Sequence, residues 1–262
     1  LDPSFGCYDG SFGISPDAAL THTPNIDTLA SQGMRYTRTY VANPVCSPSH
    51  TALLSGNYVT TIGAPHHRSH YIDDLPAGHG SLPRLLADAG YFTVNISNGD
   101  IRWGASGKTD LNFDRNTVNT PTPGDDPQPF QHLQGFNFVG PADSPYCDPS
   151  TIFTGGAWTN RLPGQPFFAY VNIETGKKHG FGTGTTWANT FGVAVDPADV
   201  IIPPYLEDSA DWRDWVARSL NAVSCTDYVV GKFLEGLDLG GEADNTLVIL
   251  ASDHGRATMR PK

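Results

Sequence analysis

The chain has 262 residues, a hydrophobic fraction of 39% and a net charge of −11. This length suffices for one large domain with a substantial core, or for two small domains. The net negative charge argues against nucleic acid as a bulk partner, because no basic face is available to displace its counterions. No apolar stretch approaches the roughly 20 residues of a membrane helix, so no membrane partner is expected.

Helix and strand signals alternate from the amino-terminal part of the chain onward. Residues 22–33 predict a helix, since Thr23 can cap it and Pro24 fits its first position. Gly33 is a typical helix terminator. The β-branched and aromatic residues of 34–42 then predict a strand.

The same alternation continues to the end of the chain. The spacing of apolar residues predicts helices at 81–90 and 209–239 and strands at 91–96, 166–173 and 245–255. Residues 97–165 are rich in Gly, Pro, Asp and Asn, and we expect a long excursion over the surface there. The alternation predicts an α/β fold with a mainly parallel central sheet flanked by helices. In such folds the chemistry gathers at the carboxyl ends of the strands.

The stretch 43–56, NPVCSPSHTALLSG, places Cys46 at the expected start of a helix, just after a predicted strand. Pro48 fits the first helical turn, and Ser47 or Ser49 can cap it. The free N–H groups of a helix amino terminus lower the pKa of a thiol and hold an anion. The residues alone leave a second interpretation open, in which Cys46 is a small buried hydrophobe.

The remaining cysteines indicate neither a disulfide framework nor a common metal motif. Four cysteines are too few for a disulfide scaffold, and Cys7, Cys147 and Cys225 are too scattered for a pair to be assigned. The chain contains no CxxC or HExxH spacing, which argues against a zinc site of the common kinds.

Four longer stretches form a combination of motifs in a fixed order along the chain: TPNIDTLASQGMRYTRTYVANPVCSPSHTALLSGNY (23–58), GKTDLNF (107–113), PFFAYVNIETGKKHG (166–180) and NTLVILASDHGRATMRPK (245–262). In this combination they resemble the sulfatase family. The first resembles its signature, in which C-x-P-S-R marks a cysteine that is oxidised to formylglycine. The others resemble its Gly-Lys-x-His/Asp motif, the strand before its sulfate-binding histidine, and its metal-binding strand with a downstream lysine. Residues 195–237 are similar to the heparan N-sulfatase (sulfamidase) branch and its bacterial relatives.

The resemblance implies a mechanism and a set of residues. A hydrated aldehyde at position 46 would attack sulfur through one oxygen, and its other oxygen would later expel sulfate. A divalent metal, Ca²⁺ with Mg²⁺ as the alternative, would lower the pKa of this nucleophile. The implied residues are Cys46, His50, Lys108, Lys177, His179 and Lys262 for catalysis, His66, His67, Arg68 and Asp110 for substrate binding, and Asp253 and His254 for the metal.

Two basic clusters favour an anionic substrate. Residues 66–68 (HHR) and 177–179 (KKH) concentrate positive or titratable groups in an otherwise acidic chain. The alternative is that both are solvated loop charges. By alignment the sulfate-binding histidine of the family falls at Lys177, with His179 two residues away, and the choice between them stays open.

The chain departs from the family pattern at two further places. His50 stands where the family has an arginine, and an imidazole offers neither the permanent charge nor the bidentate fork of a guanidinium. We therefore expect Cys46 to remain largely unmodified. The acidic pair that ends the first strand of relatives would precede Leu1, and Asp2 is expected to be a turn residue.

These observations predict one partial sulfatase-type domain over 1–262, lacking the first strand and the C-terminal subdomain, with the excursion at 97–165. The expected function is hydrolysis of a sulfate ester or sulfamate on a sulfated saccharide. The alternatives are a phosphonate or phosphate monoester hydrolase of the same superfamily and a catalytically impaired glycan-binding relative.

The family resemblance also implies export, to the periplasm, the medium or a lysosome. The first ten residues have neither the basic start nor the apolar run of a signal peptide. We therefore expect that a leader has been removed or that the chain begins inside a larger gene product. The sequence does not indicate an oligomeric state.

Overall fold

The computed structural model describes residues 5–8, 18–67, 75–97, 161–173, 175 and 181–255. In chain order, the helices and strands are α1 (Pro24–Gln32), α2 (Cys46–Ser55), α3 (Leu82–Asp88), β1 (Phe92–Ser97), β2 (Phe167–Asn172), α5 (Phe181–Thr190) and α6 (Ala210–Leu239). Short 3-10 helices are η1 (Gly6–Tyr8), η2 (Ala18–Leu20) and η6 (Ala243–Asn245). Within these ranges no helix combines the length and apolarity needed to cross a membrane.

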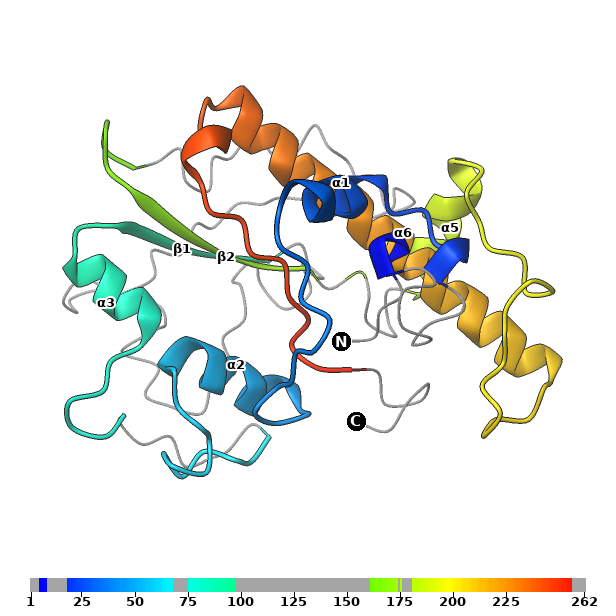
Figure 1. Ribbon diagram of the computed structural model, residues 1–262, viewed down its shortest axis with the longest axis horizontal. Coiled ribbons are helices and arrows are strands. Elements are labelled where there is room, and N and C mark those ends of the chain that lie inside the picture. Colours follow the sequence, from blue (N-terminus) through cyan, green and yellow to red (C-terminus); the bar gives the residue numbers. More distant parts are fainter. Residues whose placement is uncertain are drawn as a thin grey trace.

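β1 and β2 form a parallel pair, in register from Phe92 opposite Phe167 to Ser97 opposite Asn172. α3 leads directly into β1, so the chain follows the strand–helix alternation expected of an α/β fold (Figure 1). The helices expected at 22–33, 81–90 and 209–239 and the strands expected at 91–96 and 166–173 are confirmed. Thr23 occupies the N-cap position of α1 and Gly33 its C-cap position, as predicted, although the Thr23 side chain makes no capping hydrogen bond.

α6 is the longest helix among the residues described and organises their helical part, with α1 and α5 packed along it (Figure 1). The core around α6 consists of two apolar clusters. One is centred on Trp187, Cys225 and Val229, and the other on Val200 and Leu220. All five side chains are buried. Because burying this apolar area is what stabilises a long helix of mixed composition, α6 depends on its partners for stability.

A buried carboxylate joins α1 to α6. Asp227 is 1% exposed and accepts hydrogen bonds from the backbone N–H of Asn25, at 3.3 Å, and of Ile26, at 2.7 Å. The side-chain amide of Asn25 donates to the same carboxylate at 2.7 Å. Burial raises the pKa of Asp227, against the lowering effect of these hydrogen bonds. The N–H groups in the first turn of α1 have no acceptors within the helix. Asp227 of α6 thus supplies the acceptor for two of them.

α2 lies on one face of the sheet. Its buried Leu54 packs against Leu75 and against Phe168 and Tyr170 of β2. Phe168 and Tyr170 are two residues apart, so the pleat of the strand directs both toward this helix. This contact sets the position of the first turn of α2, where Cys46 lies.

Two strand predictions are wrong. Residues 34–42 and 245–255 are not strands, and their apolar side chains are exposed, with Tyr40 at 89% and Leu247 at 85%. The β-branched and aromatic content of both segments is real, but a strand also needs a hydrogen-bonded neighbour, and neither segment pairs with one among the residues described. Most of the expected excursion at 97–165 lies outside the described residues.

The close contact between α5 and α6 at Gly184 generates a stability prediction. A Cβ atom added to Gly184 of α5 would lie 2.6 Å from Cα of Ala222 in α6, whereas one added to Gly182 would meet nothing within 4 Å. We expect Gly184→Ala to destabilise the protein by about 1–3 kcal/mol, because the two helices must separate. Gly182→Ala, in the same helix, is the matched control and should be neutral or stabilising by up to about 1 kcal/mol.

Urea unfolding followed by tryptophan fluorescence measures both variants. Equal free energies of unfolding for the two alanine variants would show that α5 and α6 do not approach as closely as described.

Candidate active site

Cys46 is the first residue of α2, as the sequence predicts. Val45 is the N-cap residue, in an extended conformation, and its carbonyl accepts the N–H of Ser49 at 2.9 Å. Because Val45 is the N-cap residue and Ser47 and Ser49 lie inside the helix, the expected capping by Ser47 or Ser49 is wrong. Cys46 is half-buried, which also excludes its alternative interpretation as a fully buried hydrophobe. The thiol lies where a helix amino terminus favours negative charge.

The segment that follows η6 runs to this first turn of α2 (Figure 1). The buried hydroxyl of Ser49 donates to the backbone carbonyl of Asp253 at 2.5 Å. Sγ of Cys46 lies 3.1 Å from Nε2 of His254. Asp253 and His254, the two expected metal ligands, therefore lie beside Cys46, whereas Lys108, an expected catalytic residue, lies outside the described residues.

The hydrogen bonds of His254 determine which ring nitrogen carries the proton. Nδ1 lies 2.7 Å from the carbonyl oxygen of Gly255, which can only accept, so Nδ1 is the donor. In the neutral ring, Nε2 then presents its lone pair to Cys46. The hydrogen bond with Cys46 raises the pKa of His254; partial burial opposes this, and the Gly255 carbonyl and the Asp253 carboxylate reinforce it. The pair can thus accommodate a thiolate beside an imidazolium.

His50 connects this group to the sheet. Its Nε2 lies 3.4 Å from Oδ2 of Asp253, and its Nδ1 is hydrogen-bonded to the hydroxyl of Tyr170. The two rings meet edge to face, with centroids 5.9 Å apart. The tautomer of the His50 ring decides which partner of its hydrogen bond with Tyr170 donates.

Cys46, Asp253 and His254 form a group that could hold a metal ion, since one ligand atom from each lies within 4.8 Å of the others. The three donors are sulfur, oxygen and nitrogen. Calcium takes six to eight oxygen ligands, and Asp253 is the single carboxylate of this group. These three residues by themselves therefore do not fit a calcium ion.

Of the other expected site residues, the structure describes His66 and His67. His66 and His67 are exposed in the turn-rich segment that follows α2. The structure does not describe Arg68, Lys108, Asp110, Lys177, His179, Lys262 or Asp2.

Sequence reasoning missed Tyr170. It lies within an almost continuously apolar strand, where its hydroxyl was the one signal of a polar role. Such a hydroxyl is ordinarily satisfied locally, so only the fold shows that it meets His50.

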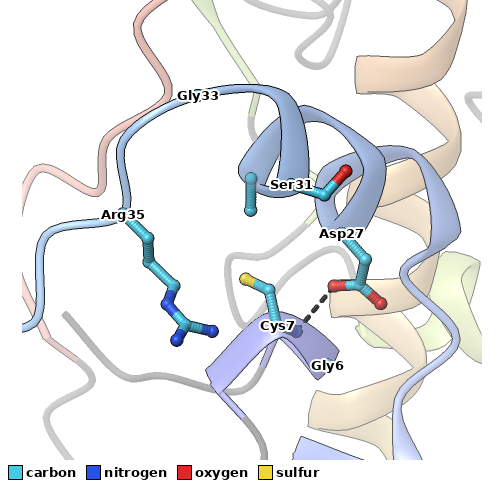
Figure 2. A pocket seen from close by; sticks show the side chains of 7 residues that line it. Gly6, Cys7, Asp27, Ser31, Gly33 and Arg35 are labelled. Atoms are coloured by element: carbon cyan, nitrogen blue, oxygen red, sulfur yellow. Dashed lines mark hydrogen bonds between the residues drawn. The ribbon is translucent and has the colours of Figure 1, made fainter.

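A hollow of about 550 Å³ lies elsewhere, between η1 and α1 (Figure 2). Its lining includes Cys7, Asp27 and Arg35 and none of the residues of the metal-ligand group. The Asp27 carboxylate already accepts the N–H of Cys7 at 2.7 Å and the hydroxyl of Thr23 at 3.1 Å. Burial raises the pKa of the Cys7 thiol, which makes it a poorer nucleophile. The candidate site therefore remains the group around Cys46, and this hollow is not a second candidate.

Comparison with protein families gives a match to the family model described as Sulfatase, over residues 6–261. The chain is 27% identical to an ulvan-active sulfatase of Formosa agariphila, in an alignment covering 98% of this chain and 43% of that protein. It is 41% identical to the N-acetylgalactosamine-6-sulfatase of Sus scrofa, over 31% of this chain and 17% of that protein. The chain thus spans less than half the length of these curated relatives.

Two solved structures share the fold. A protein of the glycosaminoglycan-metabolism locus of Bacteroides thetaiotaomicron matches with a TM-score of 0.65 at 20% identity, over 98% of this chain and 60% of that chain. A phosphonate monoester hydrolase of Agrobacterium radiobacter matches with a TM-score of 0.52 at 15% identity, over 87% of this chain and 56% of that one. Together with the parallel strand pair, these matches confirm the expected α/β fold. The proposed sulfamidase branch stays a prediction.

The contact between Cys46 and His254 predicts a reactive thiol. We expect His254→Gln to slow alkylation of Cys46 by iodoacetamide near neutral pH by about tenfold, because the imidazole that stabilises the thiolate is lost. His79→Gln, at an exposed histidine, is the matched control and should leave the rate unchanged. Mass spectrometry of the Cys46 peptide over time measures both rates, and equal rates in the two variants would contradict the assignment.

Proposed function

Because the chain belongs to the sulfatase family, we propose that the protein hydrolyses a sulfate ester or sulfamate of a sulfated saccharide. The observation that supports this most is the placement of Cys46 at the amino terminus of α2, with His254 at 3.1 Å and Asp253 in the same group. A tetrahedral sulfate suits such a place, because the free N–H groups of the first helical turn attract an anion. Saccharide substrates are favoured by relatives whose names specify ulvan and N-acetylgalactosamine 6-sulfate.

In this proposal the nucleophile is made from Cys46 by a separate maturation enzyme, which uses dioxygen as the oxidant to convert the CH₂–SH group to an aldehyde and releases the sulfur as hydrogen sulfide. Water adds to the aldehyde and gives two hydroxyl groups on one carbon. One hydroxyl loses its proton and its oxygen attacks sulfur, while the S–O bond to the sugar breaks and the sugar oxygen takes up a proton. The other hydroxyl then loses its proton, and the carbon–oxygen bond to sulfate breaks. The aldehyde is regenerated and sulfate leaves.

The described residues have separate tasks around position 46. Asp253 and His254 would hold the metal beside the hydroxyl that stands in place of the thiol. Asp253 and His50 act as a pair, because Nε2 of His50 faces Oδ2 of Asp253 at 3.4 Å. Tyr170 orients His50 through Nδ1. We assign binding of the sulfate oxygens to Lys108, Lys262 and either Lys177 or His179, and binding of the sugar to His66, His67, Arg68 and Asp110.

We propose Ca²⁺, with Mg²⁺ as the alternative, as the metal of the matured enzyme, which would stabilise negative charge on the nucleophile and the sulfate. Among the described residues Asp253 alone offers it a carboxylate in this group, so further oxygen ligands are needed. We also propose one catalytic domain over 1–262 and an exported protein, in line with the family.

The proposed activity is tested with the full protein and three substrate classes: sulfated saccharides, an aryl sulfate and a phosphonate monoester. We expect sulfate release from a saccharide, at a rate proportional to the fraction of molecules that carry the aldehyde. Cys46→Ala should lower the rate at least about a thousandfold, as removal of a nucleophile does. Cys7→Ala is the matched control and should keep the rate of the parent protein. Faster turnover of the phosphonate than of every sulfate would favour the phosphonate hydrolase instead.

Maturation is a separate prediction. We expect Cys46 to be largely unconverted in the natural sequence, because His50 lacks the charge and fork of the family arginine. His50→Arg should raise both the converted fraction and the activity. Intact mass and a tryptic map of the Cys46 peptide measure conversion, and an aldehyde in most molecules of the natural sequence would refute this expectation. If His50→Arg raises neither quantity, the glycan-binding alternative gains support.

A further inference from the structure

We infer that the encoded, unconverted form of the site binds a transition metal of the Zn²⁺ class through Cys46, Asp253 and His254. This inference concerns the thiol form and does not rest on the proposed hydrolysis. The three ligand atoms are a thiolate sulfur, a carboxylate oxygen and an imidazole nitrogen, all half-buried and within 4.8 Å of one another. Zinc binds this mixture of donors readily, whereas calcium prefers oxygen alone.

The distances between the donors suit a tetrahedral zinc ion. Usual zinc–ligand bond lengths separate a sulfur and a nitrogen ligand by about 3.6 Å, and a nitrogen and an oxygen ligand by about 3.3 Å. In the structure Sγ of Cys46 lies 3.1 Å from Nε2 of His254, and that nitrogen lies 3.4 Å from Oδ2 of Asp253. These two separations thus lie within about half an ångström of the zinc values, and the third, between the sulfur and the carboxylate oxygen, is at most 4.8 Å.

The histidine is already in the state that a metal requires. Nδ1 of His254 donates to the carbonyl of Gly255 at 2.7 Å, so the neutral ring offers the lone pair of Nε2 toward Cys46. Metal-bound histidines usually have their second ring nitrogen held by such a carbonyl, which fixes the ring orientation. The ring therefore needs no rotation on binding.

The carboxylate is supported in the same way. Nε2 of His50 faces Oδ2 of Asp253 at 3.4 Å, and Tyr170 in turn holds His50. The backbone of Asp253 is fixed by the Ser49 hydroxyl, and its Oδ1 accepts the N–H of His254 at 3.0 Å. A chain of polar contacts from β2 and α2 thus orients the ligand, as outer contacts do in known metal sites.

Three protein ligands leave one tetrahedral position open, which water can fill, as at catalytic zinc sites. Conversion of Cys46 to an aldehyde removes the sulfur and leaves oxygen donors in its place. The chemical state of residue 46 therefore determines which class of metal the site prefers: a borderline ion for the thiol, and a harder ion after conversion.

Cobalt serves as the spectroscopic probe, because thiolate bound to Co²⁺ produces an intense near-ultraviolet charge-transfer band. The experiment uses purified protein whose Cys46 peptide has the mass of the free thiol. We expect Co²⁺ to produce the band, Zn²⁺ to abolish it stoichiometrically, and a large excess of Ca²⁺ to leave it unchanged. Cys46→Ser should lose the band, whereas Cys7→Ser, at another half-buried cysteine outside any disulfide, should keep it.

Affinity and stability provide independent readouts. We expect His254→Gln to weaken Zn²⁺ binding at least about tenfold, since loss of an outer contact alone costs 10–100-fold. Zn²⁺ should raise the melting temperature of the parent protein and of Cys7→Ser, but not of Cys46→Ser, whose melting temperature without metal shows that it is folded. The inference is overturned if the thiol form yields no thiolate band, if the band persists in Cys46→Ser, or if residue 46 is an aldehyde in every molecule.

Discussion

The site depends on one tertiary contact, called the join below, between the first turn of α2 and residues Asp253 and His254. Cys46 and His254 are 208 positions apart in the sequence. The buried hydroxyl of Ser49 makes this join directional, because burying a hydroxyl is costly unless it finds a partner, and its partner is the carbonyl of Asp253. That single hydrogen bond fixes the backbone from which both the Asp253 carboxylate and the His254 imidazole project. Their side chains then meet Cys46 without any further element between them.

The join is supported from the sheet as well as from the helix. Leu54 seats α2 on Phe168 and Tyr170, and the Tyr170 hydroxyl reaches on to His50. One residue of β2 thus packs against α2 through its ring and orients a site residue through its oxygen. A shift of the helix on the sheet would disturb the packing and the polar chain together, which couples the geometry of the site to the core.

The segment before Asp253 is held by its ends. Leu247 is 85% and Ile249 is 78% exposed, so apolar burial does not position this stretch among the described residues. At one end the Thr246 hydroxyl donates to the carbonyl of Glu242 at 2.7 Å, and at the other Asp253 and His254 contact α2. Hydrogen bonds, which are directional, therefore hold Asp253 and His254 in place, and apolar packing of the preceding segment does not.

The sequence by itself determined the local elements and the class of fold. Caps, Gly and Pro positions and apolar spacing were enough for α1, α3, β1, β2 and α6, because these preferences act over a few residues. Motif order pointed to Cys46, Asp253 and His254, whose grouping the structure shows. The β-branched, aromatic and apolar residues of 34–42 and 245–255 led to wrong strand predictions. A strand must pair with a neighbouring strand, and its own residues do not specify that neighbour.

Only the tertiary structure decided how His50 and Tyr170 contact the site. It also showed that Ser49 donates to Asp253 instead of capping α2. It further decided that the sulfur, oxygen and nitrogen donors of Cys46, Asp253 and His254 come together. The physical reason is distance along the chain. Motif spacing can reveal metal ligands a few residues apart, but Cys46 and His254 become neighbours only when α2, β2 and the segment after η6 are packed together.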